Sequence, residues 1–197
     1  MTDDASFAPL PAPDVRSLRI RRLETRDIEL LMAIESVSFG RFFWSADIFH
    51  RELRNPGSRY YALTDDRESP DRLIGYNGLW KMRDEAHFTT VAIHPHLRRR
   101  SLGELMHCHL LGVSVKEGVR WITTEIRGAN VGSQNLCYKY GFYAVGLRRR
   151  YYQDNEEDAL VMVSPDLRSH AWQTLYNRRK AELRTAVGGA WPSGFSV

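Results

Sequence analysis

The sequence contains little cysteine and no long apolar run. Its two cysteines, Cys108 and Cys137, are too few for a disulfide framework and lack the spacing of metal ligands, which favours a reducing cytoplasm. No segment approaches the ~18 apolar residues that a membrane span needs. The first residues, "MTDDASFAPLPAPDV", are acidic where a signal peptide is positively charged. We therefore expect a cytoplasmic protein with no membrane partner.

A large excess of charge of one sign is also missing. The 197 residues include 28 Lys and Arg against 24 Asp and Glu, a net charge of +4 with His neutral, and 43% of the residues are hydrophobic. This composition suits one globular domain with a sizeable core and some additional material. The mild basicity is compatible with an anionic ligand or with ribonucleoprotein surroundings, but it requires neither.

Periodicity along the chain predicts an α+β fold. Residues 1–16 hold three prolines and no periodic pattern, so we expect a flexible tail. Strand-like and helix-like patterns then follow without an internal repeat, which predicts a sheet with helices packed on its faces. The predicted strands are 17–24, 58–66, 71–82, 86–93, 120–127, 143–152 and 158–164; the predicted helices are 27–39, one that begins after Ser45, 102–116 and one within 130–142.

The stretch "VAIHPHLRRRSLGELMHCHLL", residues 91–111, joins a predicted strand to a predicted helix through three arginines and a glycine. A helix N-terminus exposes unpaired backbone N–H groups and the positive end of the helix dipole, so it suits phosphate binding. Glycine allows close approach of the backbone, and arginines add charge-assisted hydrogen bonds. Taken alone, such a pattern is more often a basic surface turn.

This stretch resembles the acyl-CoA signature of the GNAT N-acetyltransferases, Arg/Gln-x-x-Gly-x-Gly/Ala, with Arg98, Ser101 and Gly103 at the signature positions. Downstream, "TTEIRGANVGSQNLCYKYGF" resembles the Glu-x-Arg-x-x-Asn…Leu-Tyr-x-x-x-Gly-Phe block of that superfamily. The segments "FFWSADIFHREL" and "RRRYYQDNEEDALVMV" are similar to segments of the RimI-type ribosomal-protein-alanine N-acetyltransferases. The resemblance continues in register from about residue 17 to residue 164.

The resemblance implies a GNAT fold for residues 17–164, followed by a C-terminal helical extension over 165–197. It implies a mixed, mostly antiparallel twisted sheet of about seven strands, a V-shaped splay between the fourth and fifth strands, and about four helices. It also implies acetyl-CoA as cosubstrate and direct transfer of the acetyl group to the N-terminal amine of a protein. The RimI-type segments favour the N-terminal alanine of a small-subunit ribosomal protein.

The family's functional residues can be placed on this sequence. The resemblance implies that the backbone of residues 91–93 pairs with the pantetheine arm, that amides of residues 99–104 hold the pyrophosphate, and that Asn130 reaches the pantetheine or thioester. Glu125 matches the general base; its alternative is a surface glutamate paired with Arg127. The full set of cofactor-binding candidates is Val91, Ala92, Ile93, Arg98, Arg99, Arg100, Ser101, Leu102, Gly103, Glu104 and Asn130.

Two positions depart from the family pattern. Ser101 replaces the first glycine of the signature; a serine can adopt helical dihedral angles and still donate its N–H, so we expect it to be tolerated. Cys137 occupies the position of the usual catalytic tyrosine, four residues before Gly141. Tyr138 cannot simply replace it, because adjacent helix residues point ~100° apart. Cys137 and Tyr138 remain candidate general acids, although an inert, space-filling Cys137 is favoured.

The remaining aromatic and histidine residues allow weaker predictions. Phe43, Trp44, Tyr151 and Tyr152 lie in segments that line the peptide-binding mouth in the family, although a core position is favoured for Trp44. Tyr151 and Tyr152 are expected to point to opposite faces of a strand, so at most one should contact substrate. His107 and His109 differ by two on a helix and cannot face together, so no metal site is predicted.

Two other functions compete with this hypothesis. The first is a GNAT enzyme that acetylates a small amine or a lysine. The second is a basic nucleic-acid-binding module that uses the arginines at 98–100 and 148–150, but no stacking-aromatic or recognition-helix motif supports it, and no direct nucleic-acid contact is expected. The C-terminal extension predicts a helix with a narrow apolar stripe that packs on the domain: Trp172, Leu175, Tyr176, Arg179 and Leu183. The acceptor's identity and the oligomeric state stay open.

Overall fold

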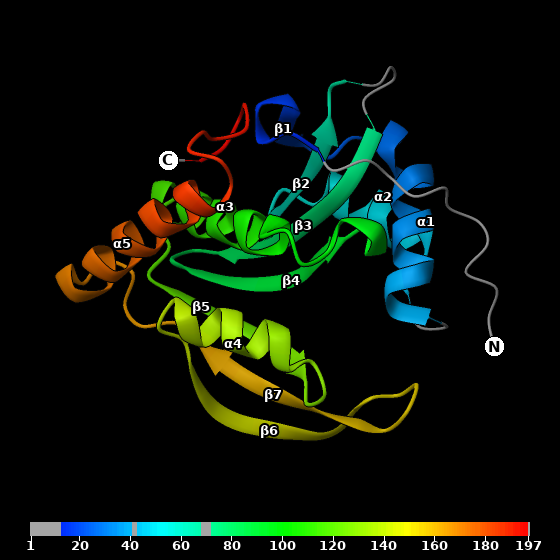
Figure 1. Cartoon of the computed structure of the whole chain (residues 1–197). Coiled ribbons are helices and arrows are strands. Elements are labelled where there is room, and N and C mark those ends of the chain that lie inside the picture. Colours follow the sequence, from blue (N-terminus) through cyan, green and yellow to red (C-terminus); the bar gives the residue numbers. More distant parts are fainter. Residues whose placement is uncertain (1–12, 41–42, 68–71, 197) are drawn as a thin grey trace.

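A single sheet with helices on both faces organises the chain in the computed structural model, which describes residues 13–40, 43–67 and 72–196 (Figure 1). The strands are β1 Leu18–Arg22, β2 Ser58–Asp65, β3 Arg72–Met82, β4 Glu85–Ile93, β5 Trp121–Arg127, β6 Tyr143–Tyr152 and β7 Glu157–Val163. The α-helices are α1 Ile28–Phe39, α2 Ala46–Arg54, α3 Leu102–Lys116, α4 Val131–Lys139 and α5 His170–Ala186. Short 3-10 helices are η1 Val15–Ser17, η2 Thr25–Asp27 and η4 Pro95–Leu97.

The sheet contains one parallel pair in an otherwise antiparallel order, β1-β2-β3-β4-β5-β7-β6. Helix α3 supplies the crossover that a parallel connection between β4 and β5 requires. The β4–β5 ladder is short: it joins Glu85–His87 to Trp121–Thr123 and ends there. The predicted mixed sheet and the splay between the fourth and fifth strands are therefore confirmed.

Two apolar clusters lie on opposite faces of the sheet. Helices α1 and α2 cover one face, where Leu31, Phe49 and Tyr76 are fully or almost fully buried. Helices α3, α4 and α5 belong to the cluster on the other face, which includes Leu105 and Ile122. Helix α3 is apolar around most of its circumference, and such a helix is stable only when it is buried on nearly all sides. Strands β5, β7 and β6 carry α4 on one face (Figure 1).

The C-terminal extension shares its core with the domain, as its apolar stripe predicts. The Trp172 indole donates to the Tyr140 carbonyl at 3.0 Å, and the Tyr176 hydroxyl donates to the Cys108 carbonyl at 3.3 Å. The chain then returns to the first strand, where the N–H of Ser193 donates to the Leu18 carbonyl at 3.1 Å. At the other end, residues 1–12 of the predicted tail lie outside the described residues, whereas Val15 is buried in the core.

Candidate active site

The fork between β4 and β5 begins beside a bulge in β4. Gly78 of β3 pairs with Thr90 and the next residue pairs with Phe88, so Thr89 is an extra residue that bends β4. Gly78 has no room for a side chain, because a Cβ there would lie within 2.2 Å of the Tyr60 ring. The Tyr60 hydroxyl is 3.1 Å from the Thr89 hydroxyl and holds the bulge in place.

Beyond the bulge, one edge of β4 lies open along the fork. Val91, Ala92 and Ile93 pair with β3 through Asn77, Tyr76 and Gly75, and the ladder to β5 has already ended at His87. Alternate N–H and C=O groups of these three residues therefore face the fork, in the manner of an edge strand that can accept one more extended chain. Pairing of these three residues with the pantetheine arm stays a prediction.

The turn between β4 and α3 has an unusual backbone. Arg99 and Ser101 both have left-handed dihedral angles, with φ of 62° and 60°. The expectation that Ser101 takes helical angles is therefore wrong: it caps α3 with φ 60° and ψ 6°, because the chain must reverse direction before the first helical turn. Left-handed residues in such a turn gather successive N–H groups into a concave surface that suits an anion. At Gly103, a Cβ would contact only Ile93 Cγ1, at 3.9 Å.

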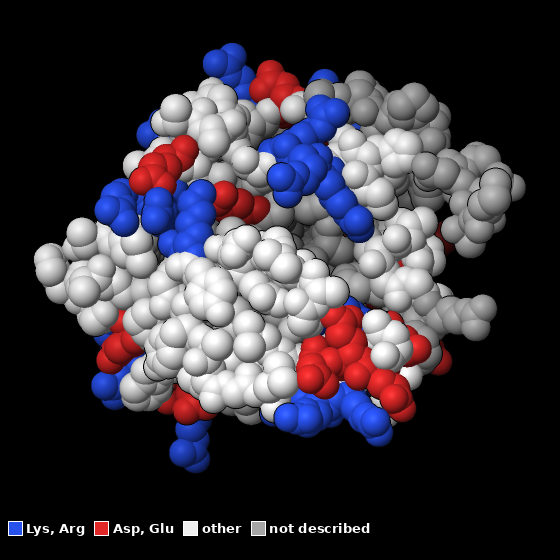
Figure 2. Space-filling view, turned by 60° about the horizontal axis from the view of Figure 1, so that its bottom comes forward, with Lys and Arg blue, Asp and Glu red and all other residues white. Residues whose placement is uncertain are grey.

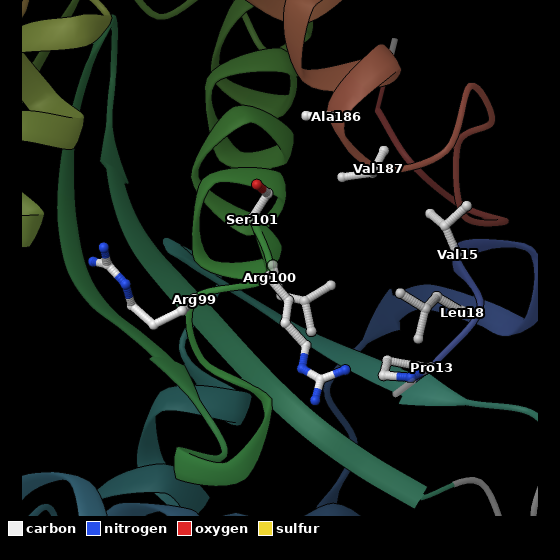
Figure 3. A pocket seen from close by; sticks show the side chains of 9 residues that line it. Pro13, Val15, Leu18, Arg99, Arg100, Ser101, Ala186 and Val187 are labelled. Atoms are coloured by element: carbon white, nitrogen blue, oxygen red, sulfur yellow. The ribbon is translucent and has the colours of Figure 1, made fainter. Parts of the chain in front are cut away.

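The three arginines of this turn leave it in different directions. The Arg98 guanidinium donates to the Ile93 carbonyl at 3.0 Å and to the Ser38 hydroxyl at 2.8 Å, so it fastens the turn to β4 and α1. Arg100 points toward Pro13, and Arg99 points to the opposite side (Figure 3). A cavity of about 350 Å³ separates the turn from the end of α5; its lining consists of Pro13, Val15, Leu18, Arg99, Arg100, Ser101, Leu102, Ala186 and Val187. The Arg98 guanidinium thus has both of these partners within the protein. Its predicted role in cofactor binding stays a prediction.

Two further cofactor candidates have side chains that act within the protein. The Glu104 carboxylate binds Lys139 Nζ at 2.6 Å and accepts from the Tyr140 hydroxyl at 3.1 Å, which ties the first turn of α3 to the end of α4. The Asn130 side chain caps α4 by accepting from the Ser133 N–H at 3.1 Å. Leu102 is buried in the core, so only its backbone can serve the predicted cradle.

Glu125 lies where the two strands have just separated, two residues beyond Thr123 at the end of the ladder. Only 10% of its side chain is exposed. One carboxylate oxygen is 3.0 Å from His87 Nε2, and the other is 3.1 Å from a guanidinium nitrogen of Arg148. The alternative pairing with Arg127 is wrong, because Arg127 turns toward the β6–β7 turn and binds Asp154 at 2.8 Å.

The predicted acids Cys137 and Tyr138 point in different directions from α4. Cys137 is 4% exposed, and burial raises the pKa of its thiol to about 12. Tyr138 is 48% exposed. Because α4 begins at Val131, directly after Asn130, there is no shift of the helix that would turn Tyr138 toward the fork. The geometry favours a space-filling Cys137, and both catalytic roles stay predictions.

The aromatic candidates lie in two places, with Phe43 and Trp44 just before α2 and Tyr151 and Tyr152 at the end of β6. The Trp44 ring stacks on Trp80 at 6.4 Å, and the backbone N–H of Trp44 donates to the Glu35 carboxylate at 2.8 Å. Phe43 is 38% exposed. Tyr151 and Tyr152 do not point to opposite faces as expected: their rings lie 5.2 Å apart at 89°. A bulge between Arg148 and Tyr152, with Arg150 at φ 50°, breaks the alternation of the strand.

The Tyr152 hydroxyl donates to the backbone carbonyl of Glu125, the candidate base, at 3.2 Å. Tyr151 is 42% exposed and lies under the Arg148 guanidinium. Figure 2 shows the surface on this side of the molecule, where Lys and Arg side chains gather on one rim of a recess and Asp and Glu side chains on the opposite rim.

Among the described residues, no group of three or more His, Cys, Asp or Glu could hold a metal ion. No helix in the same part of the chain is long and apolar enough to cross a membrane.

Comparison with known proteins identifies the architecture. The model of the acetyltransferase (GNAT) family matches residues 25–142, more than half of the chain. The chain belongs to the GNAT acetyltransferase family. This membership makes the protein an N-acetyltransferase.

Several relatives of this GNAT protein are named bS18-alanine N-acetyltransferases. The Escherichia coli (strain K12) [ribosomal protein bS18]-alanine N-acetyltransferase is 31% identical over 150 residues, which cover 74% of this chain and 96% of the relative. A Bacillus subtilis (strain 168) relative, provisionally given the same name, is 34% identical over 143 residues, 73% of this chain and 92% of the relative. The crystal structure of the E. coli ribosomal-protein-S18-alanine N-acetyltransferase superposes with a TM-score of 0.68 at 28% identity, over 76% of this chain and 94% of that one.

Sequence reasoning missed three residues of this GNAT site, namely His87, Arg148 and Trp80. All three lie on the face of the sheet that carries Glu125, but on β4, β6 and β3. Their strands pair in a register that no local pattern reveals. The one available signal was the alternation of β4, in which the buried Ala86 and Phe88 place His87 on the opposite face.

Proposed function

We propose that this GNAT enzyme transfers the acetyl group of acetyl-CoA to the N-terminal amine of a protein, and that its acceptor is the N-terminal alanine of ribosomal protein bS18. The names of the relatives support the acceptor. The observation that carries the chemistry is the Glu125 carboxylate, which is almost buried at the point where β4 and β5 separate. A ribosomal acceptor also implies that the enzyme acts in the cytoplasm.

The residues of the fork fit acetyl-CoA. The open edge of Val91, Ala92 and Ile93 offers backbone hydrogen bonds to the amides of the pantetheine arm. The left-handed turn and the N-terminus of α3 offer N–H groups to the pyrophosphate, with Gly103 allowing close approach. The cosubstrate supplies a thioester whose carbonyl carbon is open to attack by an amine.

Glu125 would remove the proton that makes the substrate amine unreactive. An α-amine has a pKa near ~8, against ~10.4 for lysine, so its proton is the easier one to remove at neutral pH. Glu125 takes this proton directly or through one water, and the neutral nitrogen attacks the thioester carbonyl. The new C–N bond forms, the C–S bond breaks, and the leaving CoA thiolate takes up the second proton, which the nitrogen loses as it becomes an amide.

The test compares acceptors by mass spectrometry with acetyl-CoA in excess. A peptide with the bS18 N-terminus should gain one acetyl group at its α-amine. The same peptide with a blocked N-terminus and an internal lysine should gain none, and spermidine should not react. Acetylation of spermidine or lysine in preference to the free N-terminus would overturn the proposed acceptor class and leave the family assignment in place.

Substitution of Glu125 tests the mechanism separately. Glu125→Gln preserves the shape of the side chain but cannot accept a proton at neutral pH. We expect kcat to fall roughly 10²-fold, the scale of general-base catalysis, with the affinity for acetyl-CoA unchanged. Raising the pH should restore part of the rate, because more of the amine then arrives neutral. Normal turnover by this variant at pH 7 would remove Glu125 from the mechanism.

A further inference from the structure

His87 is fixed beside Glu125 on three sides. Its Nε2 atom is 3.0 Å from the Glu125 carboxylate, and its Nδ1 atom is 2.9 Å from the Thr123 hydroxyl. Its ring stacks on the Trp80 indole at 5.6 Å, and that indole is itself held by a 2.5 Å hydrogen bond to the Glu52 carboxylate. Only 20% of the His87 side chain is exposed, so the imidazole has little freedom to turn.

The register of the sheet brings these residues together. Trp80 pairs with His87 across β3 and β4, and His87 pairs with Thr123 across β4 and β5. Paired residues project to the same face, and so does Glu125, two residues beyond Thr123. His87 and Thr123 form the last pair before the strands separate. His87 therefore sits on the closed end of the fork and reaches toward the open end.

The two contacts of His87 define one protonation state. Burial lowers the pKa of His87; the charge of Glu125 opposes this shift and that of Arg148 reinforces it, and the net direction keeps the imidazole neutral at neutral pH. A neutral imidazole carries one N–H, and an ionised carboxylate only accepts. The hydrogen must therefore lie on Nε2, facing Glu125, and Nδ1 must accept from the Thr123 hydroxyl.

We propose that His87 is a positioning residue for the general base: its Nε2–H holds one oxygen of Glu125 in place, while Nδ1 accepts from the Thr123 hydroxyl. The other oxygen faces Arg148, whose side chain is 56% exposed. This oxygen is consequently the one that can exchange its partner for a substrate ammonium or a water. The inference rests on the proposed role of Glu125 as the base. Misplacement of a catalytic group by about 1 Å can cost as much as ~10²-fold in rate.

Steady-state kinetics of three variants give the first test. His87→Ala should lower kcat roughly 10- to 100-fold without changing KM for acetyl-CoA, since the cofactor contacts lie elsewhere. The amide nitrogen of Gln can occupy the position of Nε2, whereas that of Asn corresponds to Nδ1 and stops short of Glu125. His87→Gln should therefore recover most of the lost rate, and His87→Asn should recover little. His170→Ala, at an exposed histidine of α5, is the matched control.

A double-mutant cycle shows whether His87 acts through Glu125. If it does, His87→Ala should cost almost nothing further in the Glu125→Gln background. Additive losses would overturn the inference, and so would wild-type kcat in His87→Ala. These outcomes differ from failure of the proposed function, in which Glu125→Gln itself turns over normally.

The tautomer gives a measurement that does not depend on turnover. In ¹⁵N NMR spectra at pH 7, the His87 signal, assigned by its loss in His87→Gln, should show a protonated Nε2 and an unprotonated Nδ1. Glu125→Gln, whose amide can donate as well as accept, should mix the two tautomers, while Thr123→Val should leave the Nε2–H form dominant. A dominant Nδ1–H form in the wild-type protein would contradict the inference.

Discussion

Two substitutions at Gly103, by alanine and by valine, should separate the stability of the fold from the affinity for the ligand. Gly103 is the second residue of α3, and a Cβ there would meet only Ile93 Cγ1, at 3.9 Å, an ordinary contact. Alanine loses less backbone entropy than glycine in a helix, a difference of roughly 0.5–1 kcal/mol. Gly103→Ala should therefore raise the free energy of unfolding by up to ~1 kcal/mol, equivalent to about 2–4 °C in Tm for a chain of this length.

The larger side chain of Gly103→Val should weaken acetyl-CoA binding, whereas the methyl group of Gly103→Ala should not, because the family signature accepts alanine at this position. The valine would project from the first turn of α3 toward Ile93 on the open edge of β4, where the pyrophosphate and pantetheine meet in the proposed complex. Holding the pyrophosphate away from the helix N-terminus should raise Kd about tenfold, or ~1.4 kcal/mol. Calorimetry gives Kd directly. A melting experiment should show a higher Tm for Gly103→Ala without ligand, and a smaller upward shift on adding acetyl-CoA for Gly103→Val.

Gly112 in the same helix provides the control with the opposite outcome. A Cβ there would lie 2.6 Å from the Ser196 carbonyl oxygen and 3.0 Å from the Tyr176 hydroxyl, so the C-terminal segment would have to move. Gly112→Ala should lower Tm and leave Kd for acetyl-CoA unchanged. If Gly103→Val binds acetyl-CoA as tightly as the wild type does, the N-terminus of α3 is not the pyrophosphate site. If Gly103→Ala melts lower than the wild type, our account of the packing around Gly103 is wrong.

Three other substitutions test neighbouring parts of the structure. Ser101→Gly relieves a left-handed serine, so it should stabilise the protein to chemical denaturation by up to ~1 kcal/mol with Kd unchanged; a loss of stability would contradict this. Cys137→Ala should keep kcat within a few-fold, and a ~10²-fold drop in a folded variant would instead make the thiol a proton donor. Burial raises the pKa of Glu35 to about 7, although a hydrogen bond from the backbone N–H of Trp44 opposes this shift. The contribution of this raised pKa to the free energy of unfolding is fully present below pH 4.5 and is lost as the pH rises through 7. The Tm advantage of Glu35→Gln should widen from pH 5 to pH 8; a constant difference would refute it.

Elements with a strong local pattern were predictable from sequence. Helix α3 and strand β6 occupy the predicted residues, 102–116 and 143–152. For α3, the apolar pattern and Gly118 just after it are local properties of the sequence. The position of Glu125 followed from a family motif within one strand. The splay followed from the same resemblance, and the structure traces it to the short ladder and the bulge at Thr89.

Features that depend on pairing between distant strands were not predictable. His87 and Arg148 lie 38 and 23 residues from Glu125, and a slip of one residue in any of the intervening pairs would turn them to the other face. The direction of Arg98 depends on Ser38 of α1, sixty residues earlier in the chain. The left-handed angles of Ser101 also escaped prediction, because the helical pattern begins only at Leu102 and carries no information about the turn that precedes it.

The convergence of the site follows from the single parallel pair in the sheet. Because β4 and β5 run in the same direction, their carboxyl ends meet at one edge, which also carries the N-terminus of the crossover helix α3. An anion site at a helix N-terminus and a carboxylate near the end of the next strand must then lie at the same opening. The bulge at Thr89 turns that opening into a fork, while the pair His87 and Thr123 keeps its other end closed. The base is thus attached to the rigid part of the sheet, at the border of the part that must stay open for substrate.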